Sequence, residues 1–233
     1  WNDNTRKHDI VAQAAKKLDY DEVSLFKFDD TYDSDEELHV RMQGITAAVS
    51  RDSIVLFQYP SMVSARYDGF VMEHLKNICG AKVAVIVEDL GSRIATSDYK
   101  QLSDEINLFN KADLLIVQST EMELNLKENG LKKMPVMYQR VWDYPYDFYL
   151  EELEIDKKMD KIHDISMRHM LDIKKAGLAL TATTDRKNKY DLMINPFETG
   201  FCICACIPMI VPEQTNIAEF VSRYGIGFVM SED

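Results

Sequence analysis

The residues best suited to chemistry lie in Asn195–Phe220, which reads NPFETGFCICACIPMIVPEQTNIAEF. This pattern predicts an apolar helix, a short buried strand, a polar loop and the start of another helix. In an α/β sheet, the loop after a strand faces the ligand crevice. A helix that begins there presents unpaired N–H groups and a partial positive charge. We therefore predict that the loop Gln214-Thr215-Asn216 faces a phosphorylated ligand.

Polar residues also follow the strands predicted in the first half of the chain. Each is ordinary turn chemistry alone, but the carboxyl ends of parallel strands share one edge of a sheet, so together they predict the wall of a cleft. Asp89 is the candidate general base, because a carboxylate that leaves an apolar strand can be partly desolvated. The polar groups are Asn2-Asp3-Asn4 before the first helix, Gln58-Tyr59-Pro60-Ser61, Glu88-Asp89 and Gln118-Ser119.

The elements that must position these side chains form an alternating pattern. Short apolar runs are separated by segments with helical patterning, which is typical of βα units. The sequence therefore predicts an α/β fold with a mostly parallel sheet that helices cover on both faces. We also expect a further strand before Trp1, to lead into the first helix. The apolar runs are Val23–Phe28, Ile54–Gln58, Val83–Val87, Leu114–Val117 and Pro135–Gln139.

A change of composition at Trp142–Glu154 predicts a linker, because this segment combines Pro145 with clustered aromatic residues. We therefore assign residues 1–141 to an N-terminal domain and 142–233 to a C-terminal domain. The second domain is predicted to contain a helix at 156–175 and strands at 178–182 and 227–230. About 80 residues are fewer than the roughly 100 of a usual doubly wound domain, so we expect part of this domain to be absent. We also expect both ends of the chain to continue in a longer protein.

Composition narrows the class of protein. The formal net charge of −12 argues against DNA or RNA as a partner. No apolar run approaches the roughly 20 residues of a membrane span, and no leader precedes the first helix, so we expect a cytoplasmic protein without membrane insertion. Dinucleotide and ATP-binding glycine motifs are missing from the sequence. Cys202, Cys204 and Cys206 are two residues apart on a predicted helix, so they cannot converge on one metal ion, and we expect small buried side chains.

Several segments together make the sequence similar to a known family. In the first half they are IVLFQYPS, VAVIVEDL, NKADLLIVQS and VWDYP, and in the second half CIPMIVPEQTNIAEFVSRYGIGFV. The chain resembles the bacterial nucleotide-sugar-synthetase-like glucosyltransferases that extend O-linked GlcNAc on serine-rich repeat adhesins. The resemblance implies a GT-B architecture, in which two Rossmann-like domains face a cleft. It also implies homo-oligomers, often tetramers.

The resemblance further implies a reaction and a division of the site. A hexose, most simply glucose from UDP-glucose, would pass to GlcNAc on an adhesin, with no cofactor and no metal ion. Asp89 would act as the base or would orient the acceptor. The UDP-sugar would be bordered by Asn195, Glu198, Thr215, Asn216 and Ile217, with Asp3 across the cleft. The acceptor would be bound by Asn2, Gln58, Ser61 and Glu88.

Two other functions stay open. The first is a non-catalytic paralogue that binds glycan or steadies a partner glycosyltransferase. It is favoured by Glu198, where the family commonly has a lysine, and by Glu88, where a histidine is common. The second is a sugar-nucleotide epimerase or synthetase, which the missing dinucleotide motif disfavours.

Overall fold

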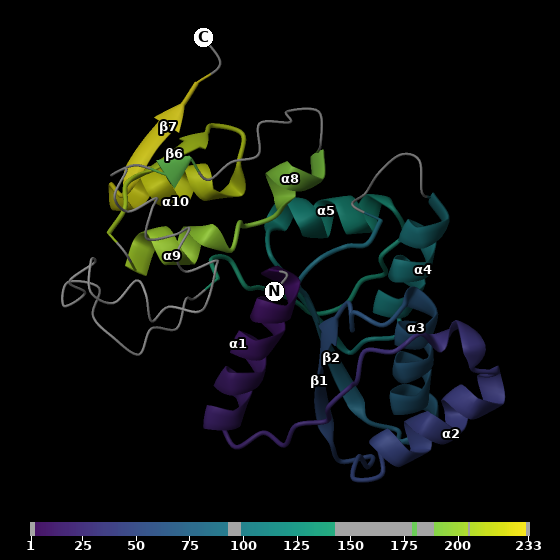
Figure 1. Cartoon of the computed structure of the whole chain (residues 1–233). Coiled ribbons are helices and arrows are strands. Elements are labelled where there is room, and N and C mark those ends of the chain that lie inside the picture. Colours follow the sequence, from purple (N-terminus) through teal and green to yellow (C-terminus); the bar gives the residue numbers. More distant parts are fainter. Residues whose placement is uncertain (1–2, 93–98, 143–178, 181–188, 205, 232–233) are drawn as a thin grey trace. The chain divides into compact units, whose positions relative to one another are not determined.

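The chain forms two compact units, Trp1–Gln139 and Arg140–Asp233, and each is considered on its own (Figure 1). The division falls next to the predicted linker. The computed structural model describes residues 3–92, 99–142, 179–180, 189–204 and 206–231.

The first unit is built on a parallel sheet in the order β1-β2-β3-β4. Ile54 pairs with Lys82, Ala84 with Leu114, and Leu115 with Val136. The α/β class and the parallel sheet are thus confirmed. The strands are β1 (Ile54–Tyr59), β2 (Lys82–Val87), β3 (Leu114–Val117) and β4 (Val136–Tyr138).

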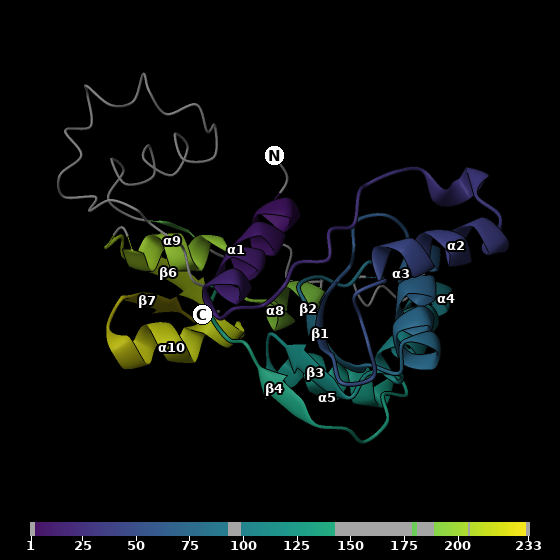
Figure 2. The same ribbon diagram turned by 90° about the horizontal axis from the view of Figure 1, so that it is seen from below.

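Helices cover both faces of this sheet. Figures 1 and 2 show α3 and α4 on one face of β1 and β2, and α1 on the other. The side chains of Ser34, Ser64 and Ser119 cap α2, α3 and α5 by accepting from a first-turn N–H group. α3 continues directly into a π-helical turn at His74–Ile78. The helices are α1 (Asp3–Lys17), α2 (Asp35–Ile45), α3 (Ala65–Glu73), α4 (Tyr99–Phe109) and α5 (Thr120–Glu128).

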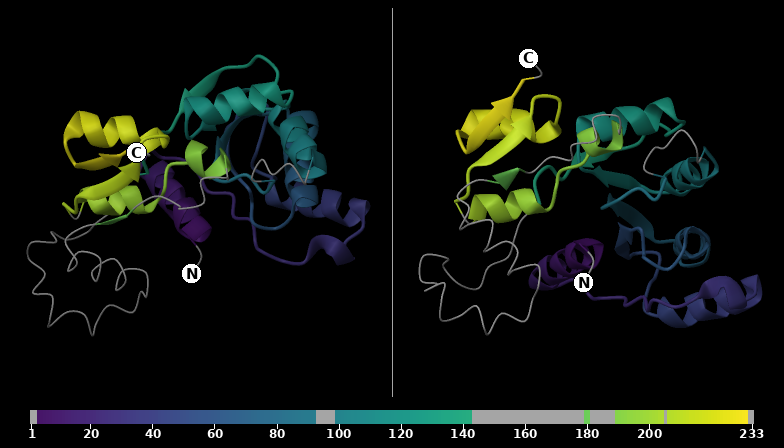
Figure 3. Two further views of the ribbon diagram at one scale, coloured as in Figure 1. Left: turned by 90° about the horizontal axis from the view of Figure 1, so that it is seen from above. Right: turned by 45° about the horizontal axis from the view of Figure 1, so that its top comes forward.

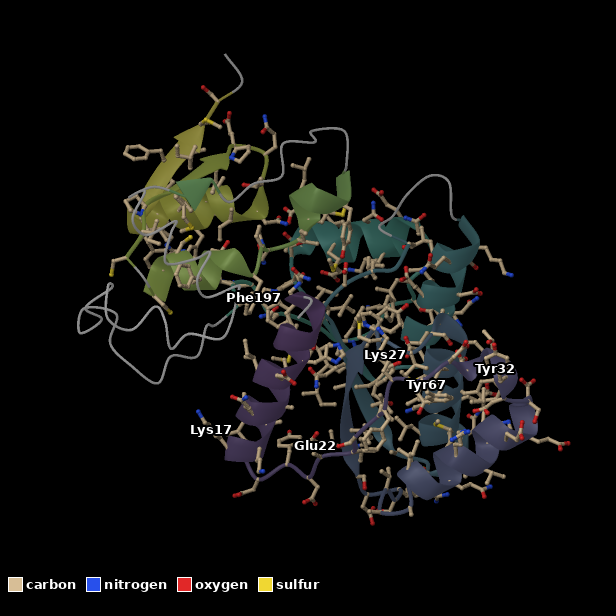
Figure 4. The ribbon with its side chains drawn as sticks, in the orientation of Figure 1. Lys17, Glu22, Lys27, Tyr32, Tyr67 and Phe197 are labelled. Carbon is tan, nitrogen blue, oxygen red and sulfur yellow. The ribbon has the colours of Figure 1, made fainter. Side chains whose placement is uncertain are left out.

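Two edge-to-face aromatic pairs pack in the first unit. Phe109 of α4 is fully buried and meets Tyr59 edge-on, with ring centroids 5.0 Å apart. Tyr67 of α3, labelled in Figure 4, is also fully buried and meets Phe28 edge-on at 5.5 Å. Such edge-to-face pairs add to the hydrophobic stabilisation that burial supplies.

The prediction of a strand at Val23–Phe28 is wrong. This segment has no regular secondary structure, and it does not pair with any strand of the described part of the chain. Val23 is 42% exposed and Phe26 is 80% exposed, whereas Phe28 packs against Tyr67. β-branched and aromatic residues favour an extended backbone, but a strand also needs a neighbouring strand. Phe28 instead contacts Tyr67 of α3 and the Arg41 guanidinium of α2.

The second unit contains a three-stranded parallel sheet in the order β5-β6-β7. Figures 2 and 3 show α9 and α10 on opposite faces of it. The predicted order of helix, strand, loop, helix and last strand is confirmed. The strands are β5 (Ala179–Leu180), β6 (Met209–Pro212) and β7 (Gly227–Met230), and the helices α8 (Lys189–Met193), α9 (Glu198–Cys204) and α10 (Asn216–Tyr224). The predicted helix at 156–175 and most of the linker lie outside the described residues.

Two glycines allow the close return of β7. Gly225 ends α10 in the left-handed region, with φ of 63°. A Cβ on Gly227 would lie 2.1 Å from the backbone oxygen of Met209, so a side chain there would push β7 away from β6.

The prediction that the cysteine trio is buried is wrong for two of its members. Cys202 is 2% exposed, but Cys204, the last residue of α9, and Cys206, which lies beyond the end of this helix, are exposed. The described residues include no group of three or more His, Cys, Asp or Glu side chains able to hold a metal ion. No helix in the described part of the chain combines the length and apolar character needed to cross a membrane.

Candidate functional site

Polar residues from three neighbouring strands meet at the carboxyl edge of the first sheet. Gln58 is the next-to-last residue of β1, Glu88 follows β2 and Gln118 follows β3. The Glu88 N–H donates to the Tyr59 carbonyl at 2.9 Å, and the Gln118 side-chain amide donates to the Glu88 carbonyl at 2.8 Å. The predicted meeting of these loops at one edge is therefore confirmed.

The Glu88 carboxyl group lies inside this edge, where it is 1% exposed. With its amide nitrogen turned toward the two oxygens, Gln58 donates to Glu88 Oε1 at 2.6 Å and to the His8 carbonyl at 3.2 Å. His8 Nε2 lies 3.2 Å from Glu88 Oε2. His8 comes from α1 and was not predicted as a site residue, because a single histidine in a helical pattern carries no signal of its partner.

Burial sets the protonation of this pair. The pKa of Glu88 is raised from 4.5 to about 8, mainly by desolvation; Lys7 opposes the rise and the Asp89 charge adds to it. Desolvation also lowers the pKa of His8, against a hydrogen bond to the Pro60 carbonyl that favours the charged ring. The 3.2 Å contact is therefore not an ordinary ion pair at neutral pH, because neither group favours its charged form there.

This shift makes stability depend on pH. Between pH 4.5 and 8 the unfolded chain releases the Glu88 proton and the folded chain keeps it, so the free energy of unfolding should fall as pH rises through this window. The loss should be on the order of 4 kcal/mol. Glu88→Gln has no proton to lose and should remove this part of the pH dependence. Urea unfolding at pH 5 and 8.5 measures the free energy of unfolding of both proteins. An equal change between the two pH values in the wild type and in Glu88→Gln would contradict this prediction.

Asp89 follows Glu88 but faces a different environment. Its side chain is half-buried, and its Oδ1 accepts from the Leu90 N–H at 2.9 Å. The next turn is held by Glu105 of α4, which accepts from the Gly91 N–H at 2.7 Å and the Ser92 N–H at 3.3 Å. Glu105 Oε1 also accepts from the Tyr59 hydroxyl at 3.0 Å. The loop that carries Asp89 is therefore tied to both α4 and β1.

The backbone of Ser61 is held by the buried carboxyl group of Asp68. The Ser61 N–H donates to Asp68 Oδ1 at 3.3 Å. Asp68 is 1% exposed, and burial raises its pKa to about 7, although the hydrogen bonds from Ser61 oppose the rise. Ser61 itself is half-buried, so it stays accessible at this edge.

In the second unit, the loop after β6 leads into α10 as predicted. Thr215 is the N-cap residue, but its hydroxyl donates to the Pro212 carbonyl at 2.7 Å and does not cap the helix. Asn216 reaches back to the Leu192 carbonyl at 2.8 Å, and Ile217 is buried. The N-terminus of α10 therefore has no side-chain cap from Thr215.

The other predicted residues are placed as follows. The Asn195 side-chain amide donates to the Arg140 carbonyl. Glu198 is the first residue of α9 and Asp3 the first of α1, and the side chains of both lie outside the described part of the structure, as does the whole of Asn2.

Comparison with known proteins covers nearly the whole chain. The family model "Glucosyltransferase 3-like, N-terminal domain" matches residues 4–141, and "Glucosyltransferase 3-like, C-terminal domain" matches residues 148–232. The chain belongs to the Glucosyltransferase 3-like family. The residues that match the N-terminal family model include Glu88 and the sheet edge around it. The residues that match the C-terminal family model include the loop that leads from β6 into α10.

Two relatives from this family have curated names. Glucosyltransferase 3 of Streptococcus gordonii is 27% identical over 94% of this chain and 78% of its own length. Glucosyltransferase 3 of Streptococcus parasanguinis is 22% identical over 95% of this chain and 78% of its own length. The likeness therefore spans both compact units.

Proposed function

We propose that this protein is a glucosyltransferase that moves glucose from UDP-glucose to O-linked GlcNAc on a serine-rich repeat adhesin. In this proposal its two units are the Rossmann-like halves of a GT-B enzyme. The structural observation that carries the proposal is the convergence of Gln58, Glu88 and Gln118 at one sheet edge, with Asp89 beside them. The names of the two streptococcal relatives support glucose as the sugar.

Asp89 would be the base. The acceptor hydroxyl of GlcNAc would attack the anomeric carbon of glucose and lose its proton to the Asp89 carboxylate. A new C–O bond would form while the bond from that carbon to the β-phosphate oxygen breaks, and UDP would leave with the electron pair. Asp89 suits this role better than Glu88, because it is half-buried whereas Glu88 is 1% exposed. Ser61 and Gln58 would border the acceptor, and Glu88 would shape the floor beneath it.

The N-terminus of α10 would bind the departing diphosphate. Because Thr215 uses its hydroxyl on Pro212, the amides of Asn216 and Ile217 are not capped by this side chain, whereas the Thr215 N–H already donates to the Pro212 carbonyl at 3.1 Å. A helix N-terminus stabilises negative charge through these amides and the helix dipole. Such donors can stabilise the leaving group without a metal ion, so we include metal independence in the proposal.

UDP binding and transfer provide the test. The full-length protein should bind UDP in a calorimetric titration and should transfer glucose from UDP-glucose to a GlcNAc-modified serine-rich peptide, as followed by mass spectrometry. Transfer should be equal with and without EDTA. UDP-galactose and UDP-GlcNAc serve as comparison donors for UDP-glucose in the same transfer assay. Failure to bind UDP at millimolar ligand would overturn the enzyme proposal, and loss of transfer in EDTA would overturn its metal-independent part.

One observation favours the second candidate, a non-catalytic member that binds glycan. The buried Glu88 carboxyl group is engaged by Gln58 and faces His8, so these residues can serve the fold alone. This candidate predicts binding of the GlcNAc-modified peptide without UDP binding or transfer. The same titration and transfer assay therefore separates the two functions.

A further inference from the structure

Two buried atoms face each other at the sheet edge. His8 Nε2 and Glu88 Oε2 lie 3.2 Å apart, and neither has a hydrogen bond to any other group among the described residues. A buried polar atom without a partner costs on the order of 1–3 kcal/mol. The Pro60 carbonyl already accepts a hydrogen bond from the His8 ring, so that ring nitrogen carries its proton. His8 Nε2 can then form a hydrogen bond with Glu88 Oε2 only if one proton lies between these two atoms.

We infer that His8 is a positioning residue: through one proton shared with Glu88, it holds α1 at the carboxyl edge of β1 and β2. Gln58 reinforces this contact, because the same amide meets Glu88 Oε1 at 2.6 Å and the His8 carbonyl at 3.2 Å. Both the side chain and the backbone of His8 are thus tied to the sheet edge. α1 begins at Asp3, five residues before His8, so the contact fixes the helix that carries this proposed donor-side residue.

The charged neighbours of the pair come from two elements. Lys7 and Asp9 lie next to His8 on α1, and Asp89 follows Glu88 at the end of β2. Lys7 favours ionised Glu88, whereas Asp89 disfavours it; Asp9 favours protonated His8, and Lys7 disfavours it. These opposing charges leave burial as the main influence on both groups. The contact should therefore keep its one proton at neutral pH and lose it above about pH 8, when Glu88 ionises.

The inference rests on the proposed function only where it concerns the effect of the His8 contact on the sugar donor. Its main test therefore does not require glucose transfer. Amide hydrogen exchange of the full chain, corrected for intrinsic rates, measures the protection of α1 at pH 6.5 and pH 9.5. In the wild type, protection of α1 should fall about tenfold relative to α5 at the higher pH, as expected for the loss of one hydrogen bond of about 1.4 kcal/mol.

Two variants make the test specific. Glu88→Gln can donate its amide N–H to His8 at any pH, so α1 should stay protected at both values. His8→Phe keeps a ring but cannot accept, so α1 should be less protected at both. His39→Phe on α2, whose ring is exposed, is the matched control and should behave as the wild type. Unchanged protection of α1 in the wild type at pH 9.5, or equal loss in Glu88→Gln, would overturn the inference.

A kinetic readout extends the test if transfer is observed. His8→Phe should raise the KM for UDP-glucose more than it lowers kcat, because it displaces the start of α1 and leaves Asp89 in place. A protein with no transfer but with the expected exchange pattern would overturn the proposed function and leave the His8 contact standing. Transfer with an unchanged KM in His8→Phe would overturn the donor-side effect of this contact.

Discussion

Replacing Asp89 by asparagine is expected to lower kcat for glucose transfer by about 10²-fold or more, the usual contribution of a general base. The amide keeps the size of the side chain and can still accept from the Leu90 N–H, which now donates to Oδ1 at 2.9 Å. It cannot take the proton of the acceptor hydroxyl. Because the loop is held independently by Glu105, the KM for the acceptor should change far less than kcat. Steady-state kinetics with the GlcNAc-modified peptide measure both constants.

The matched control for this variant is Asp52→Asn. Asp52 is exposed and precedes β1, at the amino edge of the same sheet, so its kcat should equal that of the wild type. Folding of both variants is checked by their unfolding transitions in urea. A normal kcat for Asp89→Asn would remove Asp89 from the mechanism. An equal fall in both variants would show that the loss is not specific to this edge.

Replacing Glu105 by alanine is expected to lower the free energy of unfolding by about 2–4 kcal/mol, because it leaves buried donors without an acceptor. The donors are the Tyr59 hydroxyl, the Gly91 N–H, the Ser92 N–H and the Ser92 hydroxyl. Burial raises the pKa of Glu105, while these same hydrogen bonds lower it, so removal of the carboxyl group also relieves some desolvation. Since Gly91 and Ser92 follow Asp89 closely, kcat should fall as well. Urea unfolding and the transfer assay measure the two effects.

The control for Glu105→Ala is a substitution of its neighbour on α4, Asp104. Asp104 is exposed on α4, so Asp104→Ala should change the free energy of unfolding by no more than about 0.5 kcal/mol. Glu105→Gln adds a second comparison, because its amide oxygen keeps one acceptor. Its loss in free energy of unfolding should therefore fall between the losses for Asp104→Ala and Glu105→Ala. If Glu105→Ala were as stable as Asp104→Ala, the loop after β2 would not depend on this carboxyl group.

Much of the fold could be predicted because the local pattern and the tertiary environment agree. Runs such as Val83–Val87 are apolar on both faces, which suits a strand of a parallel sheet covered by helices. The one failed strand, Val23–Phe28, is also rich in apolar residues, but it has no neighbour to pair with among the described residues. Composition alone could not distinguish the two, because pairing depends on residues far away in the chain.

The candidate site could be predicted only as a region. The sequence places Glu88 and Asp89 after β2, but it does not say which carboxyl group turns inward. Successive side chains at a strand end point in opposite directions, and both faces of this sheet are covered, so either choice fits the pattern. The structure buries Glu88 and leaves Asp89 half-buried. The raised pKa of Glu88 follows from this burial and not from its local sequence.

The sequence by itself determined the α/β class, the shared carboxyl edge of β1, β2 and β3, and the turn from β6 into α10, because each depends on local periodicity and on chain order. Only the tertiary structure decided that His8 meets Glu88, 80 positions along the chain, with Gln58 between them. A helix pattern defines which residues share a face, but not where that face docks. That choice, and the desolvation that comes with it, depends on packing across the whole unit.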